Sequence, residues 1–389
     1  MKNNGKKFGL FQLIDQKRFR ELVDKWEMDK WVREFKTWEM TCALISCMTM
    51  RLGSYREVEE ALGIPRSTFG DAMTERSHGF FEALCDEILF SIRAKTEDRK
   101  VKRAIRQLLV IDSSEIPVHG SLFSAHDWKS KTSRADNRLA SAKLHLVWNI
   151  DGQWVNDFMI TGVRRHDSPV SRLFSLEADK TYVFDRAYND FRFWLEIIKT
   201  GSHFVTRLKK QSFARFKDAQ RAEAKNRNRD GVLYDGIYEP NLGLLRKSKV
   251  PPKLRLGFKL RCVVYRDQET KKVFYFVTSD FESTAQMIAD IYKKRWAVEL
   301  LFRWLKSHLD IRRLTARNKN AVKIQLATAV LIQLLLQLKK TIERYKGTLW
   351  ELLRSIRTSL IAKSLSGMRA PSRCRWKSAT RANLTAAFL

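Results

Sequence analysis

The sequence is poor in the residues that stabilise small secreted or zinc-bound domains. Its 389 residues include five cysteines, and no two of them form a C-x-x-C pair. An odd number of scattered cysteines argues against a disulfide framework and against a zinc ribbon, and it fits a reducing compartment. The longest apolar run, residues 326–338, is interrupted by Gln333 and Gln337 and is too short to span a bilayer. No signal-peptide-like stretch follows the first residues, so we expect a cytoplasmic protein outside the membrane.

Acidic residues are also scarce. Lys and Arg number 74 against 43 Asp and Glu, which gives a net charge of +31 and a pI near 10.1. Such an excess attracts polyanions, and nucleic acid is the commonest partner of a protein this basic; a membrane surface is the alternative. Residues 1–106 are nearly balanced, with 21 basic and 17 acidic residues, whereas residues 300–389 have 19 and 3. The polyanion surface should therefore lie mainly outside the first hundred residues.

The first hundred residues alternate amphipathic helical patterns with short breaks, which predicts a small helical domain over residues 1–104. Within it, residues 55–69 have the outline of a helix-turn-helix. Gly63 would make the turn, and Leu62, Ile64 and Phe69 would be buried. An ordinary helical hairpin with a Gly-Ile-Pro break explains the same residues, and both interpretations stay open.

Strand patterns begin at residue 107. The order is strand 107–111, a hairpin of strands 143–150 and 154–161, helix 170–176, strand 181–184, helix 190–199 and strand 203–208. Two of these strands run directly into an aspartate, Asp112 and Asp185. Residues 209–281 break the rhythm and read as a β-rich insertion, after which a single helix is expected over 283–308 with Ser283 as its N-cap.

Four polar side chains share one face of that expected helix. At 100° per residue, Tyr292, Arg295, Glu299 and Lys306 fall within an arc of about 60°. Carboxylates at strand ends can converge on Mg²⁺ or Mn²⁺, and two such ions stabilise both oxygens of an in-line phosphodiester displacement. Asp112, Asp185 and Glu299 could form that cluster, while Arg295 and Lys306 would meet phosphate.

The spacing Tyr292-x₂-Arg295-x₃-Glu299-x₆-Lys306 resembles the Y-R-E-K signature of DDE transposases of bacterial insertion sequences, in the family numbered four. Asp112 and Asp185 are similar to the first two catalytic acids of that family. The resemblance implies an α/β fold: a ribonuclease-H-like catalytic core in two parts, residues 105–208 and 282–345, around a β insertion at 209–281. The N-terminal helical domain, which would bind DNA, precedes this core, and a basic C-terminal region, residues 346–389, follows it.

The resemblance also implies a function. The protein would bind the ends of an insertion sequence and catalyse metal-dependent cleavage and strand transfer, with two Mg²⁺ or Mn²⁺ ions held by Asp112, Asp185 and Glu299. Tyr292, Arg295, Lys306 and the insertion aromatic Phe274 would contact DNA. The partners would be double-stranded element ends and target DNA, bound by a homodimer in the nucleoid-associated part of the cytoplasm.

Each residue also has a structural explanation. A strand-end aspartate often caps a turn, Asp185 could pair with Arg186, and Arg295 with Glu299 could be an ordinary i,i+4 pair. Two other functions remain open as well: a metal-dependent nuclease that cuts without joining, and a DNA-binding regulator derived from a transposase. Four residues at fixed spacings on one arc, preceded by two aspartates in the right order, favour the transposase.

Overall fold

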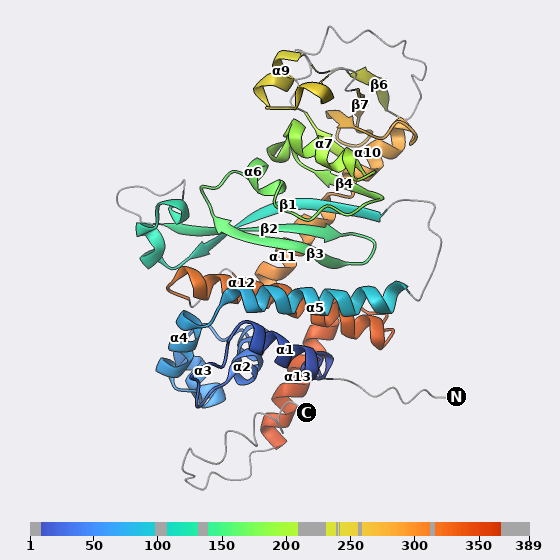
Figure 1. Cartoon of the computed structure of the whole chain (residues 1–389). Coiled ribbons are helices and arrows are strands. Elements are labelled where there is room, and N and C mark those ends of the chain that lie inside the picture. Colours follow the sequence, from blue (N-terminus) through green and yellow to red (C-terminus); the bar gives the residue numbers. More distant parts are fainter. Residues whose placement is uncertain are drawn as a thin grey trace, which may run out of the picture.

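The chain folds as a mixed α/β protein around one eight-stranded sheet (Figure 1). The computed structural model describes residues 9–97, 107–130, 139–208, 231–238, 240, 242–255, 259–311 and 316–366. The strands are β1 (Gln107–Val118), β2 (Ala140–Asn149), β3 (Trp154–Gly162), β4 (Lys180–Phe184), β5 (His203–Arg207), β6 (Val232–Tyr238), β7 (Leu260–Arg266) and β8 (Val273–Thr278). Their order in the sheet is β3-β2-β1-β4-β5-β8-β7-β6.

Helices precede, interrupt and follow these strands. The N-terminal helices are α1 (Gln16–Lys25), α2 (Thr37–Met50), α3 (Tyr55–Leu62), α4 (Arg66–Glu75) and α5 (His78–Glu97). Those among the strands are α6 (Asp167–Ser171), α7 (Phe191–Lys199) and α9 (Leu242–Lys247), and those after them are α10 (Ala285–Lys293), α11 (Trp296–His308), α12 (Lys319–Ile342) and α13 (Leu349–Ser366). Short 3₁₀ turns are η1 (Phe11–Leu13), η2 (Gly120–Ser124), η3 (His126–Trp128), η4 (Arg186–Tyr188) and η5 (Pro252–Leu254).

The predicted order of three strands, helix, strand, helix and strand is confirmed over residues 107–207. β1, β4 and β5 are parallel, and β2 and β3 are antiparallel to their neighbours. The expected hairpin joins β2 to β3, where the Gly152 N–H donates to Asn149 Oδ1 at 2.8 Å. The first helix of this segment is shorter and earlier than expected, because it occupies Asp167–Ser171 instead of residues 170–176.

The alternation of side chains along β1 divides the core into two layers. Leu109 and Ile111 pack with α7 on one face, in a cluster that includes Phe193 and Trp194. Leu108, Val110 and Ile116 face the other way, into a larger core shared with α10, α11, α12 and the N-terminal helices. Because successive strand residues point to opposite faces, Asp112 faces the α11 side and Ser113 the α7 side.

Helix α12 is the centre of the larger core. It lies between the sheet and the N-terminal helices, with α5 alongside it (Figure 1). Within the described residues it is the only helix long and apolar enough to cross a membrane, yet 94% of its most apolar window is buried inside the protein. The apolar run that the sequence shows at 326–338 is thus part of a longer helix with the burial of a core element.

The expected helix-turn-helix segment forms two helices, α3 and α4. Gly63 ends α3 with φ +68°, a left-handed conformation that glycine adopts without strain. Ile64 and Phe69 are buried as predicted, while Leu62 is only partly buried. The geometry fits both a DNA-reading motif and an ordinary hairpin.

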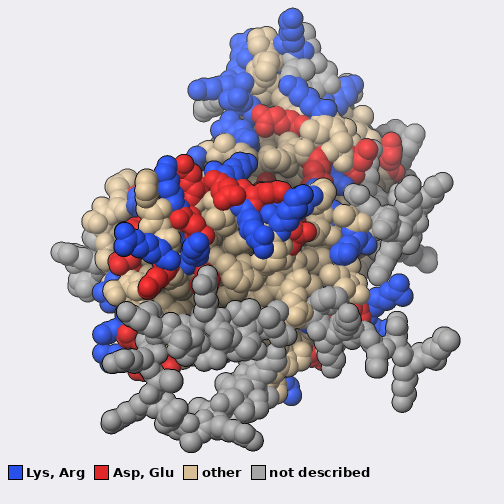
Figure 2. Space-filling model, turned by 60° about the horizontal axis from the view of Figure 1, so that its bottom comes forward, with Lys and Arg blue, Asp and Glu red and all other residues tan. Residues whose placement is uncertain are grey.

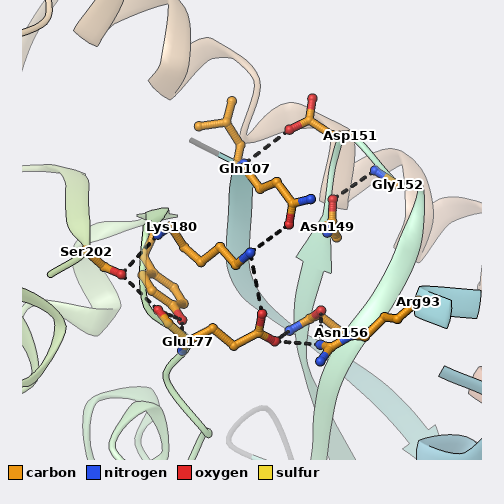
Figure 3. Close-up of polar contacts among 11 residues, drawn as sticks. Arg93, Gln107, Asn149, Asp151, Gly152, Asn156, Glu177, Lys180 and Ser202 are labelled. Atoms are coloured by element: carbon orange, nitrogen blue, oxygen red, sulfur yellow. Dashed lines mark hydrogen bonds and ion pairs between the residues drawn. The ribbon is translucent and has the colours of Figure 1, made fainter. Parts of the chain in front are cut away.

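A polar network fastens α5 to the sheet (Figure 3). The Arg93 guanidinium donates to Asn156 on β3 at 2.7 Å and to Glu177, before β4, at 2.5 Å. Lys180 on β4 donates to Gln107 on β1 at 2.9 Å and lies 3.7 Å from Glu177. The N-terminal helices therefore share both a core and charged contacts with the sheet.

Strands β6, β7 and β8 continue the main sheet, because β8 pairs with β5. The β strands expected within residues 209–281 are thus an extension of the central sheet beyond β5, and β6 and β7 lie in the upper lobe of Figure 1. Three expected features lie outside the described residues: the domain boundary near residue 104, the start of the β insertion at 209, and residues 367–389 of the basic C-terminal region.

Candidate active site

Asp112 and Asp185 lie side by side on neighbouring parallel strands. The pairing of β1 with β4 ends at Ile111 and Phe184, so the two aspartates occupy the next position of each strand. Adjacent strands are about 4.8 Å apart, which brings the two carboxylates to one point of the sheet. Asp112 does not end its strand as expected: β1 continues to Val118 by pairing with β2 alone.

Asp185 begins a turn. Its Oδ1 accepts the Ala187 N–H at 2.7 Å, which places it as the N-cap of η4. The turn-cap explanation is therefore correct for one of its oxygens. No ion pair joins Asp185 to Arg186 in the part of the chain that the structure describes, so the structural ion pair considered for this residue is absent there.

The single helix expected over residues 283–308 is wrong. The chain forms α10 and α11, separated at Lys294 and Arg295. Here the Arg295 N–H donates to the Tyr292 carbonyl and the Val298 N–H to the Arg295 carbonyl, and these i,i+3 bonds tighten the turn. The N-cap is Thr284, whose hydroxyl accepts the Met287 N–H at 3.2 Å, and Ser283 instead donates to Asp280.

The break places Tyr292 on α10, with Glu299 and Lys306 on α11 and Arg295 at the junction. Arg295 contacts two of the three acids, Asp112 and Glu299. Its Nη1 lies 2.9 Å from Asp112 Oδ2, and its Nη2 lies 2.5 Å from Glu299 Oε1. The i,i+4 pair of Arg295 with Glu299 is therefore present, but the same guanidinium also reaches Asp112, 183 residues earlier in the chain.

The electrostatics of the cluster are those of crowded carboxylates. Burial raises the pKa of Asp112 to about 6, although the Arg295 guanidinium and the Ser113 N–H lower it; the Asp185 and Glu299 carboxylates raise it further. Burial lowers the pKa of Arg295, but its acidic neighbours outweigh that and hold it above the ordinary value. Asp112 therefore lies close enough to Asp185 and Glu299 for their charges to raise its pKa.

Within the described residues, no three acidic, His or Cys side chains stand close enough to share a metal ion as they are placed. The cation between Asp112 and Glu299 is the Arg295 guanidinium. The donor set nevertheless suits Mg²⁺ or Mn²⁺, since these ions bind carboxylate oxygens and water.

A second charged group supports Asp112 from the opposite face of β1. Asp167, at the start of α6, accepts the Ser113 hydroxyl at 2.8 Å and the Lys143 ammonium at 3.2 Å. Its Oδ1 lies 3.4 Å from Nδ1 of the fully buried His145. Ser113 in turn donates its N–H to Asp112 Oδ1 at 2.8 Å. We did not anticipate Asp167 from sequence, although the dipeptide His166-Asp167 after a strand was a possible signal.

The remaining predicted contacts differ in exposure. Tyr292 is 9% exposed and packs on Phe276 with ring centroids 4.9 Å apart. Phe274 is partly buried, stacks on Phe276 and lies beneath Arg207, with 5.8 Å from its centroid to the guanidinium carbon. Trp296, at the first turn of α11, is 52% exposed and was not singled out from sequence.

Comparison with known proteins places the chain among transposases. The transposase DDE domain family matches residues 103–335. A protein of Sinorhizobium fredii described as transposase y4zB is 32% identical over 257 residues, 66% of this chain and 67% of the relative. A transposase of the insertion sequence element IS5377 of Geobacillus stearothermophilus is 26% identical over 314 residues, 79% of this chain and 76% of the relative.

The fold is similar to that of the piggyBac transposase in its synaptic complex with hairpin DNA. The TM-score is 0.51 at 11% identity, over 98% of this chain and 84% of that chain. The family match covers more than half of the sequence and contains the two adjacent aspartates and the glutamate. The chain therefore belongs to the DDE transposase family, whose members are enzymes that cleave and transfer DNA strands.

Proposed function

We propose that this transposase excises and inserts an insertion sequence by cut-and-paste transposition, with Asp112, Asp185 and Glu299 as its catalytic carboxylates. The observation that carries the proposal is that Arg295 links Asp112, which lies next to Asp185, to Glu299. Asp112 and Asp185 follow the last paired residues of two neighbouring parallel strands. Arg295 then joins Asp112 to Glu299.

The three carboxylates would hold two divalent ions, Mg²⁺ or Mn²⁺, which when bound stabilise the attacking and leaving oxygens of phosphodiester displacement. The Arg295 guanidinium contacts both Asp112 and Glu299 and would therefore lie beside the scissile strand. This fork can donate two hydrogen bonds to a DNA phosphate and fix its orientation. Lys306, two turns along α11 from Glu299, adds a positive charge for the same strand.

Tyr292 and Phe274 were both predicted to contact DNA. Tyr292 is nearly buried, so we propose that it orients Arg295, whose guanidinium carbon lies 5.9 Å from the Tyr292 ring centroid. Phe274 stacks on Phe276, so a smaller part of the Phe274 ring is left for contact with a DNA base. The exposed Trp296, beside Arg295, offers a larger stacking surface, and base stacking on an aromatic side chain contributes about 1–3 kcal/mol.

The first five strands in sheet order, β3-β2-β1-β4-β5, with α6 and α7 between strands, support the proposal that the catalytic core is ribonuclease-H-like. The β-rich segment of residues 209–281 and the N-terminal helices 1–104 would be additions to that core. We also propose that residues 346–389 form a basic C-terminal region, of which α13 is the described part.

DNA is the polyanion that this basic protein would bind, as the piggyBac complex does. Lys and Arg side chains crowd the upper lobe in Figure 2. We propose that a homodimer holds two double-stranded element ends and then a target, in the nucleoid-associated cytoplasm and without a membrane. Light scattering of the protein with end DNA should give a complex of two chains and two duplexes, and a complex of a single chain with a single duplex under active conditions would contradict the dimer.

The decisive experiment uses purified protein, a labelled duplex that carries one element end, a plasmid target and Mg²⁺. The proposal predicts cleavage at the element end followed by joining to the target. Cleavage without joining would identify a nuclease, and sequence-specific binding without any cleavage would identify a regulator. A Ca²⁺ reaction provides the control for DNA binding without chemistry.

A further inference from the structure

A basic hollow lies away from the carboxylate cluster, where α5 and α12 begin and β3 ends. Its volume is about 710 Å³, and its wall combines the 160–165 segment with residues of η3 and of the two helices. We define it by its four basic side chains, Arg164, Arg165, Lys319 and Lys323. Nothing in the proposed catalytic mechanism uses these residues.

The positive charge of this basic hollow is poorly compensated. Lys319 pairs with Asp127 at 3.1 Å, and both side chains are about half exposed. Arg164 donates to the Lys129 carbonyl at 3.1 Å, a neutral partner. Among the described residues, neither Arg165 nor Lys323 has a carboxylate within ion-pair distance.

In the part of the chain that the structure describes, Lys323 lies beside a histidine and not beside a carboxylate. Its ammonium lies 3.2 Å from Nε2 of His78, whose Nδ1 lies 3.0 Å from the Asn320 side-chain oxygen. The ammonium thus donates to a ring nitrogen where a carboxylate would stabilise it better. A hollow with an excess of one sign of charge, here four basic side chains against Asp127, focuses its field, and an anion that enters it reduces the repulsion among the cations.

We propose that the basic hollow binds the phosphodiester backbone of duplex DNA, at a position separate from the carboxylates. Arg165 and Lys323, the two cations without a carboxylate, would make the contacts. This inference rests on the proposed function, because a DNA substrate is what brings a backbone to this face. Phosphate contacts of this kind position a duplex without reading its sequence.

The place of the hollow on the sheet supports a shared substrate. Gly162, in its wall, pairs with Ala142, which pairs with Ile116, four residues along β1 from Asp112. Two strands across and four residues along correspond to about 15–20 Å. At about 3.4 Å per base pair, this is about five base pairs of duplex. Ile160, which also lines the hollow, packs in the core on the side of the sheet that Asp112 faces. One duplex could therefore contact both.

The test is a salt titration of DNA binding with the full-length protein, in EDTA so that no cleavage occurs. The probe is a fluorescent 30-base-pair duplex, and the variant is Arg165→Gln with Lys323→Gln. Loss of two phosphate contacts should reduce the slope of log K against log salt by about 1.8, since each contact contributes about 0.9. Arg192→Gln with Lys199→Gln on the exposed side of α7, which covers the face of the sheet opposite to Asp112, removes the same charge and should leave the slope unchanged.

The charge-conserving pair Arg165→Lys with Lys323→Arg should restore the wild-type slope. The inference is overturned if the glutamine pair keeps that slope, or if the α7 control loses as much. Failure of the proposed function shows separately, as wild-type protein that binds DNA with the full slope but cleaves nothing in Mg²⁺.

Discussion

Replacement of Arg295 by Lys separates the role of the guanidinium fork from that of its charge. The wild-type fork spans two carboxylates, with 2.9 Å to Asp112 and 2.5 Å to Glu299. A lysine ammonium keeps the charge but lacks the planar fork that would donate two parallel hydrogen bonds to a DNA phosphate. A hydrogen bond to a charged partner contributes about 1.5–3 kcal/mol, so loss of one should slow cleavage by about ten- to a hundredfold.

The assay is single-turnover cleavage of end DNA at saturating protein and Mg²⁺, beside a binding titration. Binding should change by less than about threefold, because one charge among many phosphate contacts is retained. Arg303→Lys, on an exposed position of the same helix, is the matched control and should cleave normally. If Arg295→Lys cleaves at the wild-type rate, the fork has no role in the reaction and Arg295 is an ordinary helix ion pair.

Three other predictions concern DNA binding, the Mg²⁺ requirement and the stability of the fold. Lys306→Ala should weaken binding at all DNA sequences and lower the salt slope by about 1, and an unchanged slope would remove Lys306 from the DNA surface. Asp167→Asn should raise the Mg²⁺ concentration for half-maximal cleavage several-fold while the melting temperature stays within a few degrees. The reason is that Ser113, whose N–H donates to Asp112, loses the charged acceptor of its hydroxyl. An unchanged Mg²⁺ requirement would contradict this. Asp157→Asn should stabilise the protein by about 1–3 kcal/mol at pH 7.5 but much less near pH 4.5, as measured by urea unfolding at both values.

The sign for Asp157 follows from its burial, which raises its pKa to about 6 although the Ser175 and Phe158 N–H groups lower it. Between the unfolded value of 3.8 and about 6, the folded protein binds more protons than the unfolded chain. The Asp157 side chain therefore favours folding at low pH, and this stabilisation is lost as pH rises through 6. Equal effects of the substitution at both pH values would refute this linkage.

Much of the sheet and of the candidate site could be predicted from the sequence, because both depend on local patterns. Apolar runs such as residues 107–111 and 181–184 indicate buried strands, and an aspartate directly after each places both acids at one point of a parallel pair. The Asn-Ile-Asp-Gly turn predicts the β2–β3 hairpin. The three spacings that separate Tyr292, Arg295, Glu299 and Lys306 then indicate Glu299 as the third candidate acid.

What the sequence could not predict depends on tertiary contacts. The break at Lys294 and Arg295 contains neither glycine nor proline, and it became visible only from the i,i+3 bonds there. β1 extends past Asp112 because β2 continues to pair with it, and Asp167 meets Ser113 across 54 residues of chain. The pairing of β8 with β5 likewise joins distant segments, which local periodicity does not reveal.

The central claim is that Asp112, Asp185 and Glu299 together bind the catalytic cations. The most direct measurement is Mn²⁺ binding by electron paramagnetic resonance, for wild-type protein and for Asp112→Ala, Asp185→Ala and Glu299→Ala, each followed by end cleavage in Mn²⁺. Each variant should lose at least about tenfold in Mn²⁺ affinity, as expected for loss of a carboxylate ligand, and should cleave no DNA while binding it within a few-fold. A variant that binds Mn²⁺ and cleaves like the wild type would contradict the assignment of that carboxylate.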